Sequence, residues 1–270
     1  MFRGFQIQLD TLDLSSLSED GQGVYDIFKT GMKPFLDKYI MPGGALDGSK
    51  IQDDWFPTDN TELQIDCFIS HAHPDQKLAI AFAAWLYDKF DIVAFIDSCI
   101  WGHADELLKQ IDNEYCRNES ADTYNYAKRN QSTAHVHLML NNALAKMMDN
   151  CECVFFLRTP QSTLKDIVGT KTGSPWIYSE ISTSQIIRKK VPPRTTTTRL
   201  VENFAATRLM SEKEKKELKV EYFLELDHLA ALSDQDLEKW AKLWSYMQLP
   251  KVGHPLDKLY EIKPVHRKST

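Results

Sequence analysis

One short stretch of the chain holds two side chains whose types and spacing could do chemistry together. Trp176 and Glu180 stand four residues apart in SPWIYSEIS, and Pro175 is suited to the first turn of a helix. Residues at this spacing lie one above the other on a single helical face, so an indole and a carboxylate share one side. Such a carboxylate can stabilise positive charge that develops on a bound molecule. The simpler alternative is a tryptophan packed in the core and a solvated glutamate at the rim of an amphipathic helix.

Further polar side chains follow the predicted strands of a buried sheet. Three runs predict such strands: 63–70, 92–97 and 151–157. Polar residues stand at their ends: Ser70 with His71, Asp97 with Ser98, and Arg158 with Thr159. In an open α/β sheet, ligands bind beyond the carboxyl ends of the strands. We therefore expect these side chains, and the start of the helix that carries the glutamate, at one edge of the sheet.

Helical segments alternate with these strands. The run 75–90 predicts an amphipathic helix with Asp75 placed to cap it. Further helices are predicted at 103–115, 135–150, 175–189 and, capped by Ser233, at 234–247. The alternation implies an α/β fold with an open parallel sheet, right-handed crossovers and helices on both faces.

The chain divides into two unequal parts. Residues 1–60 are predicted to be an N-terminal accessory segment, to which the sequence assigns no chemistry. Residues 61–270 form the main domain, with its motifs in 63–190. Within it, 114–133 has no apolar periodicity and is predicted to be an inserted polar loop. A last strand, near 218–226, and the last helix are predicted within 218–248.

The composition limits the possible partners. The chain has 270 residues, of which 43% are hydrophobic and 26% charged, and its net charge is −6. Without a basic stripe, neither a nucleic acid nor an anionic membrane is an expected partner. Five cysteines, an odd number, do not predict a disulfide framework. No run approaches the roughly 18 apolar residues of a membrane span, so the sequence predicts a soluble cytoplasmic protein.

The sequence predicts neither a metal nor a resident cofactor. His135 and His137 are two residues apart, which on a helix places them on different faces. Cys151 and Cys153 lie in an apolar run, where thiols behave as small hydrophobic groups. The glycine-rich phosphate-binding motifs and the common zinc-protease and serine-hydrolase motifs are absent from the sequence.

Four motifs together resemble those of the TIR (Toll/interleukin-1 receptor) domain. They occur in the order and approximate spacing of that family: DCFISHAHPD at 66–75, VAFID at 93–97, CECVFFLRTPQS at 151–162 and SPWIYSEI at 174–181. The resemblance covers about 63–190 and implies a flavodoxin-like sheet. The chain departs from the family in its longer stretch 114–133 and in its last strand, which is displaced toward the C-terminus. The segment from Ser98 to Asp112 matches the family's BB loop only loosely.

The resemblance implies an activity as well as a fold. Enzymatic TIR domains cleave the nicotinamide–ribose bond of NAD+, and their essential glutamate corresponds to Glu180. NAD+ would be the substrate, and the products would be nicotinamide with either ADP-ribose or a cyclic ADP-ribose. The residues expected to contact substrate are Trp176, Ser70, His71, Asp97 and Trp101. The competing expectations are a turn hydrogen bond for Ser70 and His71, a loop-capping role for Asp97, and burial against a partner subunit for Trp101.

The resemblance also implies partners and a cellular role. TIR enzymes assemble so that one protomer completes the site of the next, which implies self-association. Compact bacterial TIR proteins act in antiphage defence by depleting NAD+ or by making a nucleotide signal for a separate effector. Two other functions remain open: a TIR interaction module without chemistry, and an α/β enzyme that cleaves the N-glycosidic bonds of nucleosides.

Overall fold

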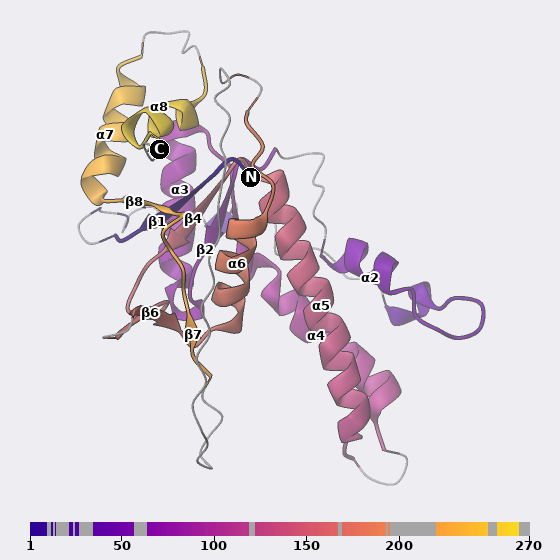
Figure 1. Ribbon diagram of the computed structural model, residues 1–270. Helices are drawn as coiled ribbons and strands as arrows, with labels where there is room; N and C mark the ends of the chain where they lie inside the picture. The colour runs from indigo at the N-terminus through magenta and orange to yellow at the C-terminus, as the bar shows by residue number, and fades with distance from the viewer. Residues whose placement is uncertain are drawn as a thin grey trace.

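The central sheet of the molecule is parallel throughout. The computed structural model describes residues 1–9, 12, 14, 22–23, 25–26, 35–56, 64–118, 122–166, 169–192, 194, 220–247 and 253–264. Its main sheet has the strand order β3-β2-β4-β1-β8. These strands are β1 (Arg3–Ile7), β2 (Cys67–Ser70), β3 (Ala94–Ile96), β4 (Cys153–Leu157) and β8 (Ala230–Leu232). With helices on both faces (Figure 1), the predicted α/β fold with a flavodoxin-like open parallel sheet is confirmed.

The strand order reverses between β2 and β4. The chain leaves β2 for β3 on one side, and then returns across β2 to β4 on its other side. Such a reversal leaves a crevice beyond the carboxyl ends of the two strands that flank it, where ligands of open α/β sheets bind. Ser70 ends β2 at this position. The topology therefore marks the neighbourhood of Ser70 as the place to look for a site.

The segment predicted to be accessory contributes a strand to the sheet. β1 lies between β4 and β8, and its residues pair along its whole length with β4. Residues 1–60 are therefore not outside the main domain, and a boundary at residue 60 would cut the sheet. The alternating pattern of FQIQL is that of a strand, but nothing local in it indicates a partner about 150 residues away. The same segment contains α2 (Gly48–Trp55), which Asp47 caps by accepting from the backbone N–H of Lys50.

The helices form two layers around the sheet (Figure 1). α3 packs against α7, which also contacts α8, whereas α5 packs against α4, α6 and α2. Their bounds are α3 (Gln76–Phe90), α4 (Trp101–Ile111), α5 (Tyr126–Asn150), α6 (Pro175–Ile186), α7 (Asp234–Ser245) and α8 (Pro255–Ile262). Short 3-10 turns are η1 (Leu36–Tyr39), η2 (His73–Asp75) and η3 (Asp97–Cys99), and the π-helical turn is η4 (Asp112–Cys116).

α5 begins earlier than predicted. Asn125 caps it by accepting from the backbone N–H of Lys128, so residues 126–133 are helical and the predicted polar loop is shorter than 114–133. Residues 119–121 of that loop lie outside the described residues. The first turns of α5 extend beyond the sheet together with the end of α4 (Figure 1). Because most side chains there face solvent, the apolar periodicity by which a helix is recognised is missing.

A second, smaller sheet is formed by residues 164–166, 169–172 and 222–223. The polar stretch 159–174 contains an antiparallel hairpin of β5 (Leu164–Asp166) and β6 (Gly169–Thr172). β7 (Tyr222–Phe223) pairs with β6, so the strand predicted near 218–226 belongs to this sheet. The last strand of the central sheet is β8 instead. It is only three residues long, which is too short for a sequence pattern to indicate.

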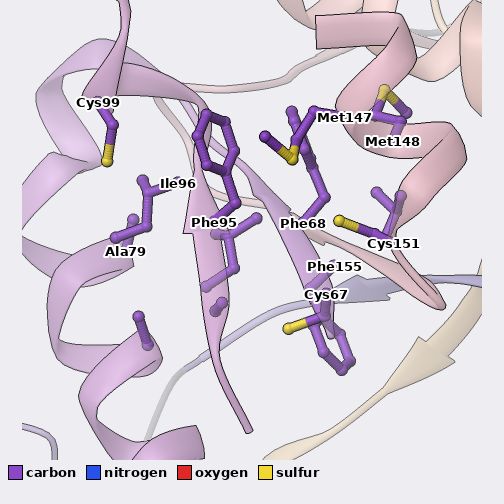
Figure 2. Packing of buried hydrophobic residues seen from close by; sticks show 14 of the residues in the cluster. Cys67, Phe68, Ala79, Phe95, Ile96, Cys99, Met147, Met148, Cys151 and Phe155 are labelled. Atoms are coloured by element: carbon purple, nitrogen blue, oxygen red, sulfur yellow. The ribbon is translucent and has the colours of Figure 1, made fainter. Parts of the chain in front are cut away.

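The core lies between the sheet and its two helical layers. Figure 2 shows strand residues Phe68 and Phe95 between Ala79 of α3 and Met147 and Met148 of α5. All five cysteines are buried free thiols, as the apolar run around Cys151 and Cys153 predicts for those two. No helix among the described residues combines the length and apolar character needed to cross a bilayer.

Candidate functional site

Glu180 lies buried at the carboxyl edge of the sheet. Ser174 caps the start of α6 by accepting from the backbone N–H of Ile177, and Pro175 occupies the first helical position, as predicted. Glu180 follows one turn later and is only 3% exposed. Its Oε2 accepts a hydrogen bond from the Ser70 hydroxyl at 2.5 Å. Its Oε1 has no hydrogen-bond donor among the described residues, and the carboxyl lies within hydrogen-bonding reach of Asp97.

The environment of Glu180 favours its neutral form. Burial raises the pKa of the Glu180 carboxyl well above its usual 4.5, and the nearby Asp97 carboxylate raises this pKa further. The hydrogen bond from Ser70 opposes the pKa shift only in part, because it stabilises the ionised form. Two carboxyl groups held close together in a dry environment are typical of functional sites, where such shifts are concentrated.

His71 compensates the charge of Asp97. Nδ1 of His71 donates to the carbonyl oxygen of Ala72 at 2.6 Å, and Nε2 lies 3.0 Å from Asp97 Oδ1. Burial lowers the pKa of the imidazole, but Asp97, the Ala72 carbonyl and Asp75 together raise this pKa by more, so the net shift is upward. An imidazolium carries a proton on each nitrogen and satisfies both contacts. Asp97 thus contacts the buried His71 imidazole on one side and faces Glu180 on the other.

Ser98 completes this group and was not among the predicted site residues. Its hydroxyl lies 2.9 Å from Nε2 of His71, and its backbone N–H donates to Asp97 Oδ1 at 2.7 Å. Ser98 directly follows Asp97 at the end of a predicted strand, so its position was a usable signal. We call Ser70, His71, Asp97, Ser98 and Glu180 the Glu180 cluster.

Trp101 lies beside the cluster. Its ring is tilted against His71 with centroids 5.3 Å apart, and is nearly parallel to that of His73 at 5.4 Å and 26°. His73 is exposed and Trp101 half-buried, so the indole extends from the surface toward the buried imidazole. The indole Nε1 is buried and has no acceptor among the described residues. The structure thus brings Trp101 to the site, although the sequence motif around it matched only loosely.

Trp176 has a different neighbour from Glu180. Its indole is half-buried and packs edge-on against His137 of α5, with ring centroids 5.4 Å apart. Glu180, four residues later, contacts Ser70 of β2. The two residues therefore share α6, but Trp176 lies toward α5 while the carboxylate lies toward the sheet. The ring contact with His137 resembles the simpler alternative for this residue, an indole packed between helices.

The N-terminal segment also reaches the site, which the sequence did not indicate. The Tyr25 hydroxyl donates to the carbonyl oxygen of Ser98 at 3.2 Å and accepts from Nε2 of Gln76 at 2.5 Å. Asp75, predicted to cap α3, stands at the N-cap position but makes no capping hydrogen bond. Its carboxylate accepts from the Thr159 hydroxyl at 2.5 Å instead, which ties the loop after β4 to the start of α3.

These groups can do acid–base or electrostatic chemistry. A buried carboxyl with one oxygen oriented by a serine and the other without a donor can receive a ligand hydroxyl or face a developing cation. Among the described residues, no three His, Cys, Asp or Glu side chains converge as metal ligands would. Comparison with protein-family models, with curated proteins and with solved structures found no match to the chain. The geometry of the Glu180 cluster and the four TIR-like motifs are therefore the two grounds on which a function can be assigned.

Proposed function

We propose that the protein cleaves the nicotinamide–ribose bond of NAD+, with Glu180 stabilising the ribose cation. The observation that carries the proposal is the buried Glu180 carboxyl at the strand reversal, with Ser70 bound to one oxygen and no donor on the other. The TIR-like motifs support it independently, because they assign the essential glutamate of that family to the same residue.

The chemistry requires one carboxylate and no metal. As the bond between C1′ of the ribose and the nicotinamide nitrogen breaks, its electron pair leaves with nicotinamide, which departs neutral and needs no proton. The ribose becomes an oxocarbenium-like cation, which an ionised Glu180 would stabilise from the oxygen that lacks a donor. Water then adds and releases a proton to give ADP-ribose, or an adenine nitrogen adds to give a cyclic ADP-ribose.

The positive charge of the substrate favours the ionised form of Glu180, which burial and Asp97 disfavour. Burial and Asp97 raise the pKa of Glu180, so its carboxyl tends to be neutral before substrate binds. The nicotinamide ring of NAD+ carries a positive charge, and a cation within a few ångströms favours the carboxylate form. In this proposal, substrate binding makes Glu180 release its proton to solvent and leaves the carboxylate that the reaction requires.

Substrate must gain access to a carboxylate that is covered in this state. Glu180 is 3% exposed, so the dinucleotide reaches it only after neighbouring groups move. Trp101, half-buried at the first residue of α4, is the side chain we expect to move. Self-association of the kind implied by the TIR resemblance would supply the energy for this step, and nicotinamide release per protein molecule should then rise with protein concentration.

The direct test measures nicotinamide release from NAD+ by the purified protein. Wild type should release nicotinamide, and Glu180→Gln should lower the rate by at least about 100-fold, as the loss of an electrostatic stabiliser does. Glu238→Gln, on the exposed side of α7, is the matched control and should retain activity. No release by wild type, even at high protein concentration, would count against the proposal. Preferential turnover of a nucleoside such as inosine would select the N-glycosidase alternative.

The near-complete burial of Glu180 favours a second candidate, a TIR-like interaction module without chemistry. In that case Glu180→Gln leaves self-association and any cellular phenotype unchanged, whereas substitutions at Trp101 and Gly102 disrupt assembly. The proposed cellular role is antiphage defence. Phage protection by wild type and by Glu180→Gln in one host separates the two candidates, since only the enzyme requires the carboxylate.

A further inference from the structure

A cavity separate from the Glu180 cluster opens at the carboxyl ends of β1 and β8. Its volume is about 650 Å³, within the range of small-molecule sites. It is lined by residues 6–8 at the end of β1, by 231–236 where β8 leads into α7, and by Arg158 and Lys263. Ser70, Phe156 and Gln6 are successive register partners across β2, β4 and β1. Gln6 is thus two strands from Ser70, or about 10 Å at the usual strand spacing.

Arg158 is held in this cavity by neutral groups. Its guanidinium donates to Gln6 Oε1 at 3.1 Å and to the Thr170 hydroxyl at 3.4 Å. Gln6 is itself fixed, because its amide donates to the carbonyl oxygens of Leu226 and Leu229. Among the described residues, no carboxylate lies within ion-pairing distance of Arg158, whereas Arg194 is paired with two carboxylates.

The other charges of the cavity narrow the class of ligand. Nζ of Lys263 lies 2.8 Å from Oδ2 of Asp236, so the charges of these two residues offset each other. Asp236 also belongs to the capping box of α7. Arg158 is left to attract an anion, and a planar guanidinium suits the oxygens of a phosphate. Asp234 in the same lining disfavours a ligand with several negative charges. The exposed amide of Gln235 can both donate to and accept from a polar ring.

We propose that this cavity binds a nucleoside monophosphate, with Arg158 on the phosphate. A single phosphate matches the guanidinium of Arg158, which has no carboxylate partner in the part of the chain that the structure describes. The volume accommodates a mononucleotide, and the amide and carboxylate groups of the lining suit the amino and ring nitrogen atoms of a base. The inference does not depend on NAD+ cleavage, because no residue of the Glu180 cluster lines the cavity.

Isothermal titration calorimetry with AMP, GMP, CMP and UMP tests the proposal, with adenosine and inorganic phosphate as partial ligands. At least one monophosphate should bind wild type more tightly than either partial ligand does. Arg158→Gln should weaken that binding about tenfold or more, since it removes charge-assisted hydrogen bonds, and Arg158→Lys should weaken it less. Arg188→Gln, an exposed arginine of similar type, is the matched control and should bind as wild type does.

A second variant keeps the test decisive if Arg158→Gln does not fold. Ala231→Phe fills the cavity from the exposed side of β8 while it leaves the guanidinium in place, and it should also abolish binding. Three results would overturn the proposal: no binding of any monophosphate at millimolar concentration, equal binding by wild type and by every folded cavity variant, or binding that is lost in Glu180→Gln but kept in Arg158→Gln.

Discussion

At the scale of single residues, the proposed activity depends on the protonation state of the Glu180 carboxyl. Burial and the Asp97 carboxylate raise its pKa well above 4.5. If the reaction needs the ionised form, kcat/KM must fall as the pH is lowered through this raised pKa, and the fall should begin well above pH 4.5. A profile of nicotinamide release against pH measures this. Asp97→Asn should move the acidic limb of this profile to lower pH, because it removes a negative charge that disfavours the ionisation of Glu180. An acidic limb at the same pH in both proteins would contradict the role of Asp97 in raising the pKa of Glu180.

The same pKa shift predicts an effect on stability. Between the ordinary and the raised pKa of Glu180, the unfolded chain has released its proton while the folded protein still holds it, so stability falls as the pH rises. The side chain in Glu180→Gln is neutral at every pH, so this variant does not lose stability in this way as the pH rises. The variant should be more stable than wild type at pH 7, by on the order of 1 kcal/mol, as replacements of strained functional groups often are.

Urea denaturation at several pH values measures this difference in unfolding free energy. The gap between Glu180→Gln and wild type should close as the pH approaches the ordinary pKa of a glutamate, because both proteins then carry a neutral side chain at this position. A gap that does not depend on pH would show that the variant acts through packing instead.

At the scale of elements, the start of α6 sets the position of the carboxylate. Ser174→Ala removes the acceptor for the Ile177 N–H and should lower the unfolding free energy by about 1 kcal/mol. Ser233→Ala removes the corresponding cap of α7 and should cost a similar amount. Because only α6 carries Glu180, we expect nicotinamide release to fall in the first variant and to stay near wild type in the second. Equal activities would mean that the cap does not position the carboxylate.

The elements that the sequence predicted well are those that pack on the core along most of their length. β2, β3 and β4 are almost wholly buried and α3 is strongly apolar, so their patterns are local and clear. The beginning of α5 projects into solvent, and β8 has three residues, so neither leaves a periodic signal. The residues at the ends of the clear strands were placed correctly for the same reason. Tyr25 was not, because its contact with Ser98 joins residues 73 positions apart.

At the scale of the whole molecule, the N-terminal strand is a structural member of the sheet. Phe5 is fully buried and stacks on Phe155 with ring centroids 5.5 Å apart. Phe5→Ala should therefore lower the unfolding free energy by about 3 to 5 kcal/mol, as large core truncations do. Phe35, 79% exposed in the same N-terminal region, provides the matched control, and Phe35→Ala should change stability by less than about 0.5 kcal/mol. Thermal or urea denaturation of the two variants checks both values, and similar losses would contradict the place of β1 in the sheet.

The position of β1 has a consequence for how the protein is made. Among the strands of the central sheet β1 is translated first, and it lies between two strands that are translated about 150 and 225 residues later. At ordinary rates of translation, the edge of β1 that pairs with β8 stays without a partner strand for on the order of ten seconds or more. During that time a strand with two large apolar side chains, Phe5 and Ile7, and with unpaired backbone groups is available to other nascent chains. Chaperones that bind extended apolar segments should therefore engage this polypeptide early in synthesis and release it only after residue 232 has emerged.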